Sequence, residues 1–225
     1  MKFTPNAVLF DAYGTLLDVY SVGQMAEELF PGHGHALARL WRDKQVDYTR
    51  LRSMAGQYRP FRDVTQEALQ FCCAMLGLPC SASQQEALMG AYARLSAFPE
   101  NSAALARIRK AGIPVAIHTN GNPEMISQAI RSAGLEQWVD VVLSADAVKR
   151  YKVDPRVYQL APDHFGSPAK DLLFVSSNGW DICGASWFGF PTFWVNRSGA
   201  PREQLGVTPT YEGTTLTEVA DLVCL

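Results

Sequence analysis

Asp11 is the residue whose position says most about the chemistry of this chain. It ends an apolar run, Ala7-Val8-Leu9-Phe10, and Gly14 follows shortly after it. The run predicts a buried strand, and the glycine permits a sharp turn. Open α/β sheets bind their ligands at the carboxyl ends of the strands, so a carboxylate here predicts an active-site acid. The alternative interpretation is that Asp11 caps the next segment.

Other polar side chains occur at equivalent places later in the chain. Thr119 and Asn120 end one apolar run, Ser176 ends another, and Lys152 follows a third. Because the carboxyl ends of parallel strands meet at one edge of a sheet, we expect these side chains to lie near Asp11. A lysine close to Asp11 would favour the ionised carboxylate, which is the nucleophilic form.

The apolar runs that carry these residues predict a parallel sheet. We expect strands over residues 7–10, 114–120, 139–144, 171–177 and 192–195. Helical patterns separate the last four runs, and this alternation is typical of a doubly wound sheet. The fold class expected is therefore α/β with a doubly wound parallel sheet.

Residues 18–97 have a different sequence pattern: apolar residues recur with helical periodicity, and few segments are typical of strands. Helices are expected to end at Phe30 and to run through 37–51, 64–76 and 83–95. The first strand cannot be stable alone and must join the later ones, so the helical block is an insertion after it. We expect a discontinuous core domain of residues 1–17 and 98–225 and a helical domain of residues 18–97.

The composition argues against several classes of protein. The 225-residue chain has 20 basic and 22 acidic residues, so no basic excess points to nucleic acid. It has no apolar run of the about 20 residues that span a bilayer. Residues 1–5 lack a signal-peptide pattern, and the five cysteines match neither a zinc motif nor a disulfide framework. We expect a cytoplasmic protein with reduced thiols and with no nucleic-acid or membrane partner.

Two motifs resemble those of the haloacid dehalogenase superfamily. Asp11-Ala12-Tyr13-Gly14-Thr15 is similar to its nucleophile motif, and Ser176-Ser177-Asn178-Gly179-Trp180-Asp181 is similar to a later one. Both look like the L-2-haloacid dehalogenase family, and the resemblance covers nearly the whole chain. It implies a Rossmann-like core with an inserted helical cap at 18–97. It also implies that short L-2-haloalkanoic acids are hydrolysed to D-2-hydroxyalkanoic acids and halide.

The resemblance implies a role for each matching residue. Asp11 attacks the halogen-bearing carbon to form an ester, and Arg42 with Asn120 receives the halide. The catalytic residues implied are Asp11, Thr15, Lys152, Ser176, Asn178 and Asp181. The substrate-binding residues implied are Tyr13, Arg42, Val46, Phe61, Thr119, Asn120, Tyr158 and Trp180. Asp181 either orients Lys152 or acts as a general base, and the sequence leaves both readings open.

A metal-dependent phosphatase of the same superfamily is one alternative. Such phosphatases carry a second aspartate two residues after the nucleophile, where this chain has Tyr13, whose ordinary pKa is near 10. They also carry an acid at the place of Ser177 in their magnesium motif, so only Asp181 of that pair remains. Magnesium prefers several oxygen ligands, so we expect a site without metal or other cofactor. The other alternative is a non-catalytic binding protein on this fold.

Some positions depart from the family pattern or have plainer readings. Val153 follows Lys152 where the family usually has proline, and Thr119 stands where it often has serine. Asp43 follows Arg42 where the family commonly has glutamine, and Arg42 alone would read as a surface residue paired with Asp43 or Asp47. The expected partners are a small 2-haloacid, halide and a second copy of the chain in a homodimer.

Overall fold

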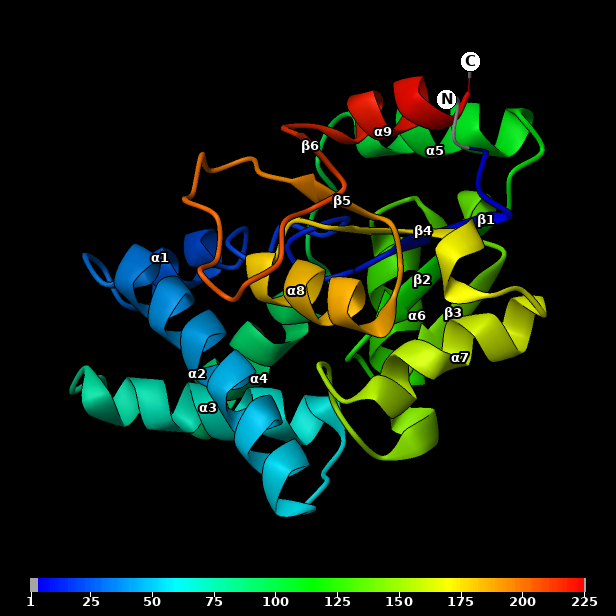
Figure 1. The fold of residues 1–225 in the computed structure, drawn as a ribbon. Coiled ribbons are helices and arrows are strands. Elements are labelled where there is room, and N and C mark those ends of the chain that lie inside the picture. The colour runs from blue at the N-terminus through cyan, green and yellow to red at the C-terminus, as the bar shows by residue number, and fades with distance from the viewer. Residues whose placement is uncertain (1–3, 225) are drawn as a thin grey trace.

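A six-stranded sheet forms the centre of the computed structural model, which describes residues 4–224 (Figure 1). The strand order is β3-β2-β1-β4-β5-β6, and every neighbouring pair is parallel. The strands are β1 (Ala7–Phe10), β2 (Val115–Thr119), β3 (Val141–Ser144), β4 (Leu172–Ser176), β5 (Thr192–Val195) and β6 (Tyr211–Gly213). The α/β class with a doubly wound parallel sheet is therefore confirmed. Residues 1–3, which belong to the N-terminal segment considered above, lie outside the described residues.

The register of the sheet aligns the ends of its three central strands. Phe10 of β1 pairs with Ile117 of β2 on one side and with Val175 of β4 on the other. Asp11 and Ser176 each come one residue later, so they reach the same level at the carboxyl edge. In open parallel sheets, ligands bind in the crevice just beyond the carboxyl ends of the strands. Asp11 and Ser176 therefore lie where a binding site is expected.

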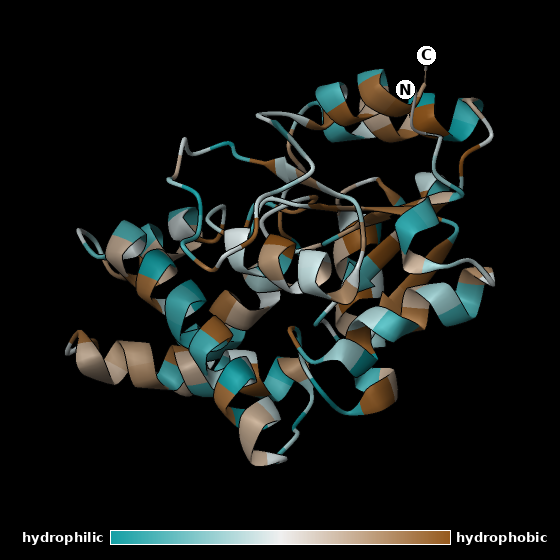
Figure 2. Ribbon diagram, in the orientation of Figure 1, coloured by the Kyte–Doolittle hydropathy of each residue, from teal (hydrophilic) through white to brown (hydrophobic). Residues whose placement is uncertain are grey.

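Both faces of the sheet are covered by helices, which explains why its strands are continuously apolar. Val8 and Phe10 pack in one cluster with residues of α5 (Asn101–Lys110), α6 (Pro123–Ser132) and α9 (Leu216–Val223). Ala7 and Leu9 pack in a second cluster with residues of α7 (Pro155–Phe165) and α8 (Gly179–Phe188). Figure 2 shows the strands mostly in brown, while the surrounding helices alternate brown and teal.

Four helices follow β1 in the chain, before α5 and β2, and are called the inserted helices below. They are α1 (Gly23–Leu29), α2 (Gly34–Ala55), α3 (Phe61–Met75) and α4 (Ala82–Tyr92). They pack beside one another at one end of the molecule, next to the carboxyl edge of the sheet (Figure 1). Glycine at 56, with a φ of 68°, ends the long helix α2 in a left-handed cap. The helices therefore lie where they can cover Asp11.

The structure adds one strand that the sequence did not predict. β6 has only three residues, Tyr211–Gly213, and pairs with β5 at the edge of the sheet. It is too short to show the alternation or the apolar run from which a strand is predicted. Within residues 4–224, no helix has the length and apolar content needed to cross a membrane.

Candidate active site

The Asp11 carboxylate lies at the carboxyl edge of the sheet, nearly buried, among several donors. Its Oδ2 accepts hydrogen bonds from Asn178 Nδ2 at 2.8 Å and from Thr15 Oγ1 at 3.1 Å, with Ser176 Oγ at 3.5 Å. Its Oδ1 accepts from Lys152 Nζ at 3.0 Å. Donors on both oxygens fix the orientation of the carboxylate at the end of β1.

Lys152 is fully enclosed and joins two carboxylates. Its ammonium group donates to Asp11 Oδ1 and, at 2.7 Å, to Asp181 Oδ2, and its third partner is the His118 carbonyl at 2.8 Å. An ammonium group has three protons, so these three acceptors satisfy it completely. The backbone N–H of Lys152 donates to Asn120 Oδ1 at 2.9 Å, which ties the lysine segment to the end of β2.

Asp181, in the first turn of α8, has no exposed surface, and both of its carboxylate oxygens are occupied. Oδ2 accepts from Lys152 and Oδ1 accepts from the Tyr158 hydroxyl at 2.7 Å. Burial raises the pKa of Asp181 from 3.8 to about 6, although the neighbouring Lys152 acts in the opposite direction. Tyr158 thus lies beneath Asp181, and it is not among the residues that line the cavity beside Asp11.

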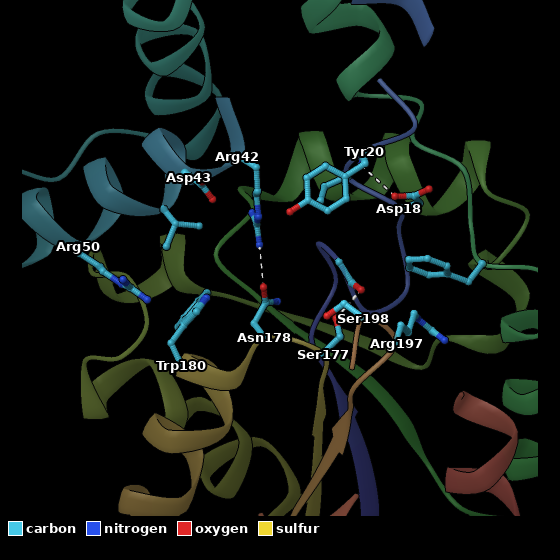
Figure 3. Close-up of a pocket in the computed structure, with 14 residues that line it drawn as sticks. Asp18, Tyr20, Arg42, Asp43, Arg50, Ser177, Asn178, Trp180, Arg197 and Ser198 are labelled. Atoms are coloured by element: carbon cyan, nitrogen blue, oxygen red, sulfur yellow. Dashed lines mark hydrogen bonds between the residues drawn. The ribbon is translucent and has the colours of Figure 1, made fainter. Parts of the chain in front are cut away.

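Arg42 projects from α2 toward the sheet edge and is only 9% exposed. Its Nη2 donates to Asn178 Oδ1 at 3.4 Å (Figure 3). Nη2 also donates to the Tyr13 carbonyl at 3.0 Å, and Nη1 donates to Gln45 Oε1 at 2.9 Å. All three acceptors are uncharged, so the guanidinium has no carboxylate partner among them. The helix pattern alone would suggest a surface arginine paired with Asp43 or Asp47. Arg42 is instead buried, and Asp47 pairs with Lys44.

A small cavity of about 10 Å³ lies between Asp11 and the inserted helices. Such a volume admits the centre of about one water molecule. Its lining residues are Asp11, Tyr13, Arg42, Val46, Thr49, Phe61, Asn120 and Trp180. Tyr13, Val46, Phe61 and Trp180, all expected as substrate-binding residues, therefore line it together. Thr49, one turn after Val46 on α2, was not predicted. The buried hydroxyl of Tyr13 has no hydrogen-bond partner among residues 4–224.

Thr119 lies close to this cavity without being one of its lining residues. Its side chain is fully buried, and its Oγ1 accepts a hydrogen bond from the Gly121 N–H at 3.0 Å. The hydroxyl retains its own proton for a further acceptor.

The donor set does not suit magnesium. Lys152 Nζ lies between Asp11 and Asp181, where a cation bridging the two would have to be. Ser177, at the place of the missing acid, donates its hydroxyl to the Gly14 carbonyl. No group of three or more His, Cys, Asp or Glu side chains that could hold a metal occurs among residues 4–224.

Comparison with known proteins identifies the family. A family model described as haloacid dehalogenase-like hydrolase matches residues 5–189. The chain belongs to this family. An (S)-2-haloacid dehalogenase of Pseudomonas sp. (strain YL) is 45% identical over 217 residues, which cover 96% of this chain and 94% of that protein.

Solved structures agree with this membership of the haloacid dehalogenase-like hydrolases. A crystal structure of an L-2-haloacid dehalogenase matches with a TM-score of 0.95 and 53% identity over 99% of both chains. The L-2-haloacid dehalogenase of Xanthobacter autotrophicus, solved with chloropropionic acid covalently bound, matches with a TM-score of 0.91 and 35% identity over 98% of both chains.

The residues that hold Arg42 in this haloacid dehalogenase-like hydrolase were not found from the sequence. Gln45 Oε1 accepts from Arg42 and also from the Tyr92 hydroxyl at 2.9 Å, and Gln45 Nε2 donates to Thr65 Oγ1 at 2.6 Å. These partners come from α2, α3 and α4. The sequence offered one indication of this arrangement. Arg42 and Gln45 are three residues apart, so they are neighbours on one face of the helix.

Proposed function

We propose that this protein is an L-2-haloacid dehalogenase, which converts short L-2-haloalkanoic acids to D-2-hydroxyalkanoic acids and halide. The observation that carries the proposal is that Lys152 donates a hydrogen bond to the Asp11 carboxylate. Positions 13 and 177, where the phosphatases have acids, are Tyr13 and Ser177. A carboxylate prepared in this way can attack carbon, and halide leaves without being protonated. The names of the relatives at 35–53% identity support the same substrate class.

In the first proposed step, Asp11 displaces halide from the 2-carbon of the substrate. We propose Oδ1 as the attacking atom. Within residues 4–224 it accepts a hydrogen bond from Lys152 alone, whereas Oδ2 accepts hydrogen bonds from Asn178, Thr15 and Ser176. The departing halide would be received by Arg42 and Asn120, since both line the cavity beside Asp11. A guanidinium without a carboxylate partner is well suited to an anion. Thr119 is the proposed partner of the substrate carboxylate, and because its hydroxyl is buried beside the cavity, the cavity must widen when substrate binds.

In the second proposed step, water attacks the carbonyl carbon of the Asp11 ester. The water oxygen stays on Asp11, and the hydroxy acid leaves with the oxygen that Asp11 supplied. One proton of the water ends on the departing hydroxyl, and the other is released to solvent as Asp11 returns to a carboxylate. Splitting the reaction through a covalent intermediate replaces one difficult step with two easier ones. Because both oxygens of Asp181 already accept hydrogen bonds, we favour Asp181 as the residue that holds Lys152 in place over a general base. Thr15, Ser176 and Asn178 would hold the Asp11 carboxylate.

The phosphatase alternative lacks the acid that protonates a leaving alcohol. Burial raises the pKa of Tyr13 well above its usual value, which makes it a poorer proton donor still. A magnesium-bound neighbour is only 16% identical, so it speaks for the fold alone. Nothing specific to this site favours phosphate-ester hydrolysis.

Halide release from L-2-chloropropanoate tests the proposed function. We expect chloride to be released at an undiminished rate after exhaustive treatment with EDTA. Activity that disappears with EDTA and returns with magnesium would favour the phosphatase. A folded protein that releases neither chloride nor phosphate would favour a binding protein.

We also propose that residues 18–97 act as a cap domain over a core of residues 1–17 and 98–225. The cap residues Arg42, Val46 and Phe61 would then meet the core residues Asp11 and Asn120 at the substrate. Limited proteolysis that cleaves first near both proposed boundaries would support this division.

A homodimer is proposed on the exposed apolar side chains of the inserted helices. Leu51 and Met54 of α2 are 53% and 85% exposed, and Met75 at the end of α3 is 63% exposed. A second copy would remove this surface from water. Sedimentation equilibrium measures the assembly, and a Met54→Glu variant should shift it toward the monomer.

The proposal of a cytoplasmic location is supported by the cysteines. All five thiols are unpaired in the structure, which suits a reducing compartment. Fractionation of the source cells would test it.

A further inference from the structure

A much larger cleft lies next to the active-site cavity. Its volume is about 540 Å³, compared with about 10 Å³ for the cavity that contains Asp11. Arg42, Val46 and Trp180 line both spaces, so these three side chains form the partition between them. A small molecule in the cleft would therefore be one layer of side chains away from Asp11. The remaining cleft walls include Tyr20, Arg50, Arg197 and Ser198 (Figure 3).

The arginines that line the cleft differ in their partners. Arg197 pairs with Glu100, so its charge is compensated. The contacts of Arg42 are all with uncharged acceptors. Arg50 is exposed and lies over the Trp180 ring, with its guanidinium carbon 5.0 Å from the ring centroid, and no acidic partner occurs for it within residues 4–224. Asp18 and Asp43 also line the cleft, so its walls carry both signs of charge. Arg50 and Arg42 follow one another from the cleft to the cavity, and each guanidinium can pair locally with a carboxylate.

On the other side of the small cavity, hydrogen bonds join residues 58–62 to the segments that follow β2 and β3. The backbone N–H of Arg62 donates to Asn122 Oδ1 at 3.1 Å, next to Phe61 of the cavity wall. The Tyr58 hydroxyl donates to Asp146 Oδ1, and the Tyr151 hydroxyl donates to the Arg59 carbonyl, each at 2.5 Å. Entry from that side would break these bonds together, whereas entry from the cleft needs only movement at the partition.

We propose that the cleft is an outer binding site for the carboxylate of the haloacid, with Arg50 as the docking cation, from which substrate passes the partition to reach Asp11. The inference rests on the proposed function, because the haloacid is the anion concerned. Trp180 gives Arg50 its position, and the alkyl part of the substrate meets the apolar surfaces of Val46 and Trp180. The hydroxy acid product, also a carboxylate, leaves by the same route.

The first experiment compares Arg50→Gln with Arg39→Gln, an exposed arginine on the same helix that does not line the cleft. For Arg50→Gln we expect KM for L-2-chloropropanoate to rise roughly threefold to tenfold with kcat unchanged. The difference should shrink at high ionic strength, since exposed charges are screened. Arg39→Gln should behave like the parent. Equal kinetics for the two variants at low ionic strength would overturn the assignment of Arg50.

The second experiment blocks the cleft. In a Cys80→Ser, Cys224→Ser parent, whose remaining thiols are buried, Ser198→Cys is labelled with a small and then a bulky maleimide. The control is Lys170→Cys, an exposed position before β4 at the opposite edge of the sheet. We expect kcat/KM to fall about tenfold or more with the bulky label at 198 only, while single-turnover ester formation at saturating substrate is unchanged.

The outcomes separate the route from the proposed function. If the unlabelled parent releases no halide, the proposed function fails and the outer site with it. If the parent is active and the bulky label has the same small effect at 198 as at 170, only the route through the cleft is wrong.

Discussion

At the scale of single residues, the account depends on a buried lysine between two carboxylates. Lys152 is held by Asp11, Asp181 and the His118 carbonyl, so its position depends on these three acceptors. The His118 ring stays neutral, because burial and, to a smaller extent, the nearby Lys152 lower its pKa from 6.5 to about 3. The group whose titration can disturb this arrangement near neutral pH is therefore Asp181.

The pH dependence of activity should report on Asp181. Burial raises the pKa of its carboxyl from 3.8 to about 6, so the carboxyl gains a proton as pH falls through about 6. The protonated form attracts Lys152 less, and we expect kcat to be flat above this region and to fall below it. An Asp163→Asn variant, at an exposed carboxylate, should keep the same acidic limb. A profile that is flat down to about pH 4.5 would contradict the assigned role.

The raised pKa of Asp181 also makes the free energy of unfolding depend on pH. Because the folded pKa of Asp181 lies above the unfolded value, the folded chain binds a proton there between about pH 4 and 6 that the unfolded chain does not. The contribution of this group therefore favours folding most at acidic pH and is lost as pH rises through about 6.

Arg42 offers a test of charge against geometry. Arg42→Lys keeps a cation but loses the planar group that bonds Tyr13, Gln45 and Asn178 at once. We expect kcat for chloride release to fall by about 10²-fold, as for loss of one donor to a developing anion. Arg52→Lys, on the same helix and paired with Glu67, should change kcat less than about twofold. Steady-state chloride release measures both, and an unchanged Arg42→Lys enzyme would mean that this residue does not receive the halide.

At the scale of elements, the sequence predicted what is local and missed what depends on several elements. The ends of β1, β2 and β4 were predictable because each apolar run stops at polar residues, and the parallel arrangement then places Asp11, Asn120 and Ser176 at one edge. Gln45, which accepts from Arg42 on α2, is itself held by Thr65 of α3 and Tyr92 of α4, and no local pattern specifies how these three helices pack. β6 was missed because three residues at a sheet edge carry no period.

Helix α8 contains a glycine on which this arrangement depends. A Cβ at Gly184 would overlap the Tyr158 hydroxyl and lie 2.5 Å from Val153 Cγ1. Gly184→Ala should therefore destabilise the protein by about 1–3 kcal/mol and lower kcat by displacing Tyr158 from Asp181.

A matched control is available in α4. A Cβ at Gly90 would meet only the flexible end of Arg94, at 3.3 Å, so Gly90→Ala should stabilise the helix by up to about 1 kcal/mol. Urea unfolding measures both variants. Equal changes in the free energy of unfolding would refute the steric argument at Gly184.

At the scale of the whole molecule, the core and the inserted helices must together select one enantiomer. Asp11 is fixed at the end of β1, while Arg42 comes from α2 and Thr119 from β2. Attack from behind, a bound carboxylate and a bound halide define three points around the carbon. We expect L-2-chloropropanoate to be consumed and the D form to be left almost untouched, because its alkyl group would meet the wall formed by Tyr13 and Trp180. Chiral chromatography of a digested racemate measures this, and equal consumption of both enantiomers would contradict the three-point arrangement.

The central claim is that Asp11 forms an ester with the substrate, and isotope labelling tests it most directly. Excess enzyme is allowed a single turnover in ¹⁸O-water, and the Asp11 peptide and the product are analysed by mass spectrometry. The account predicts that ¹⁸O enters the Asp11 carboxylate while the D-2-hydroxy acid carries unlabelled oxygen from Asp11. Label in the hydroxy acid, with Asp11 unlabelled, would show that water attacks the substrate directly and would contradict the account.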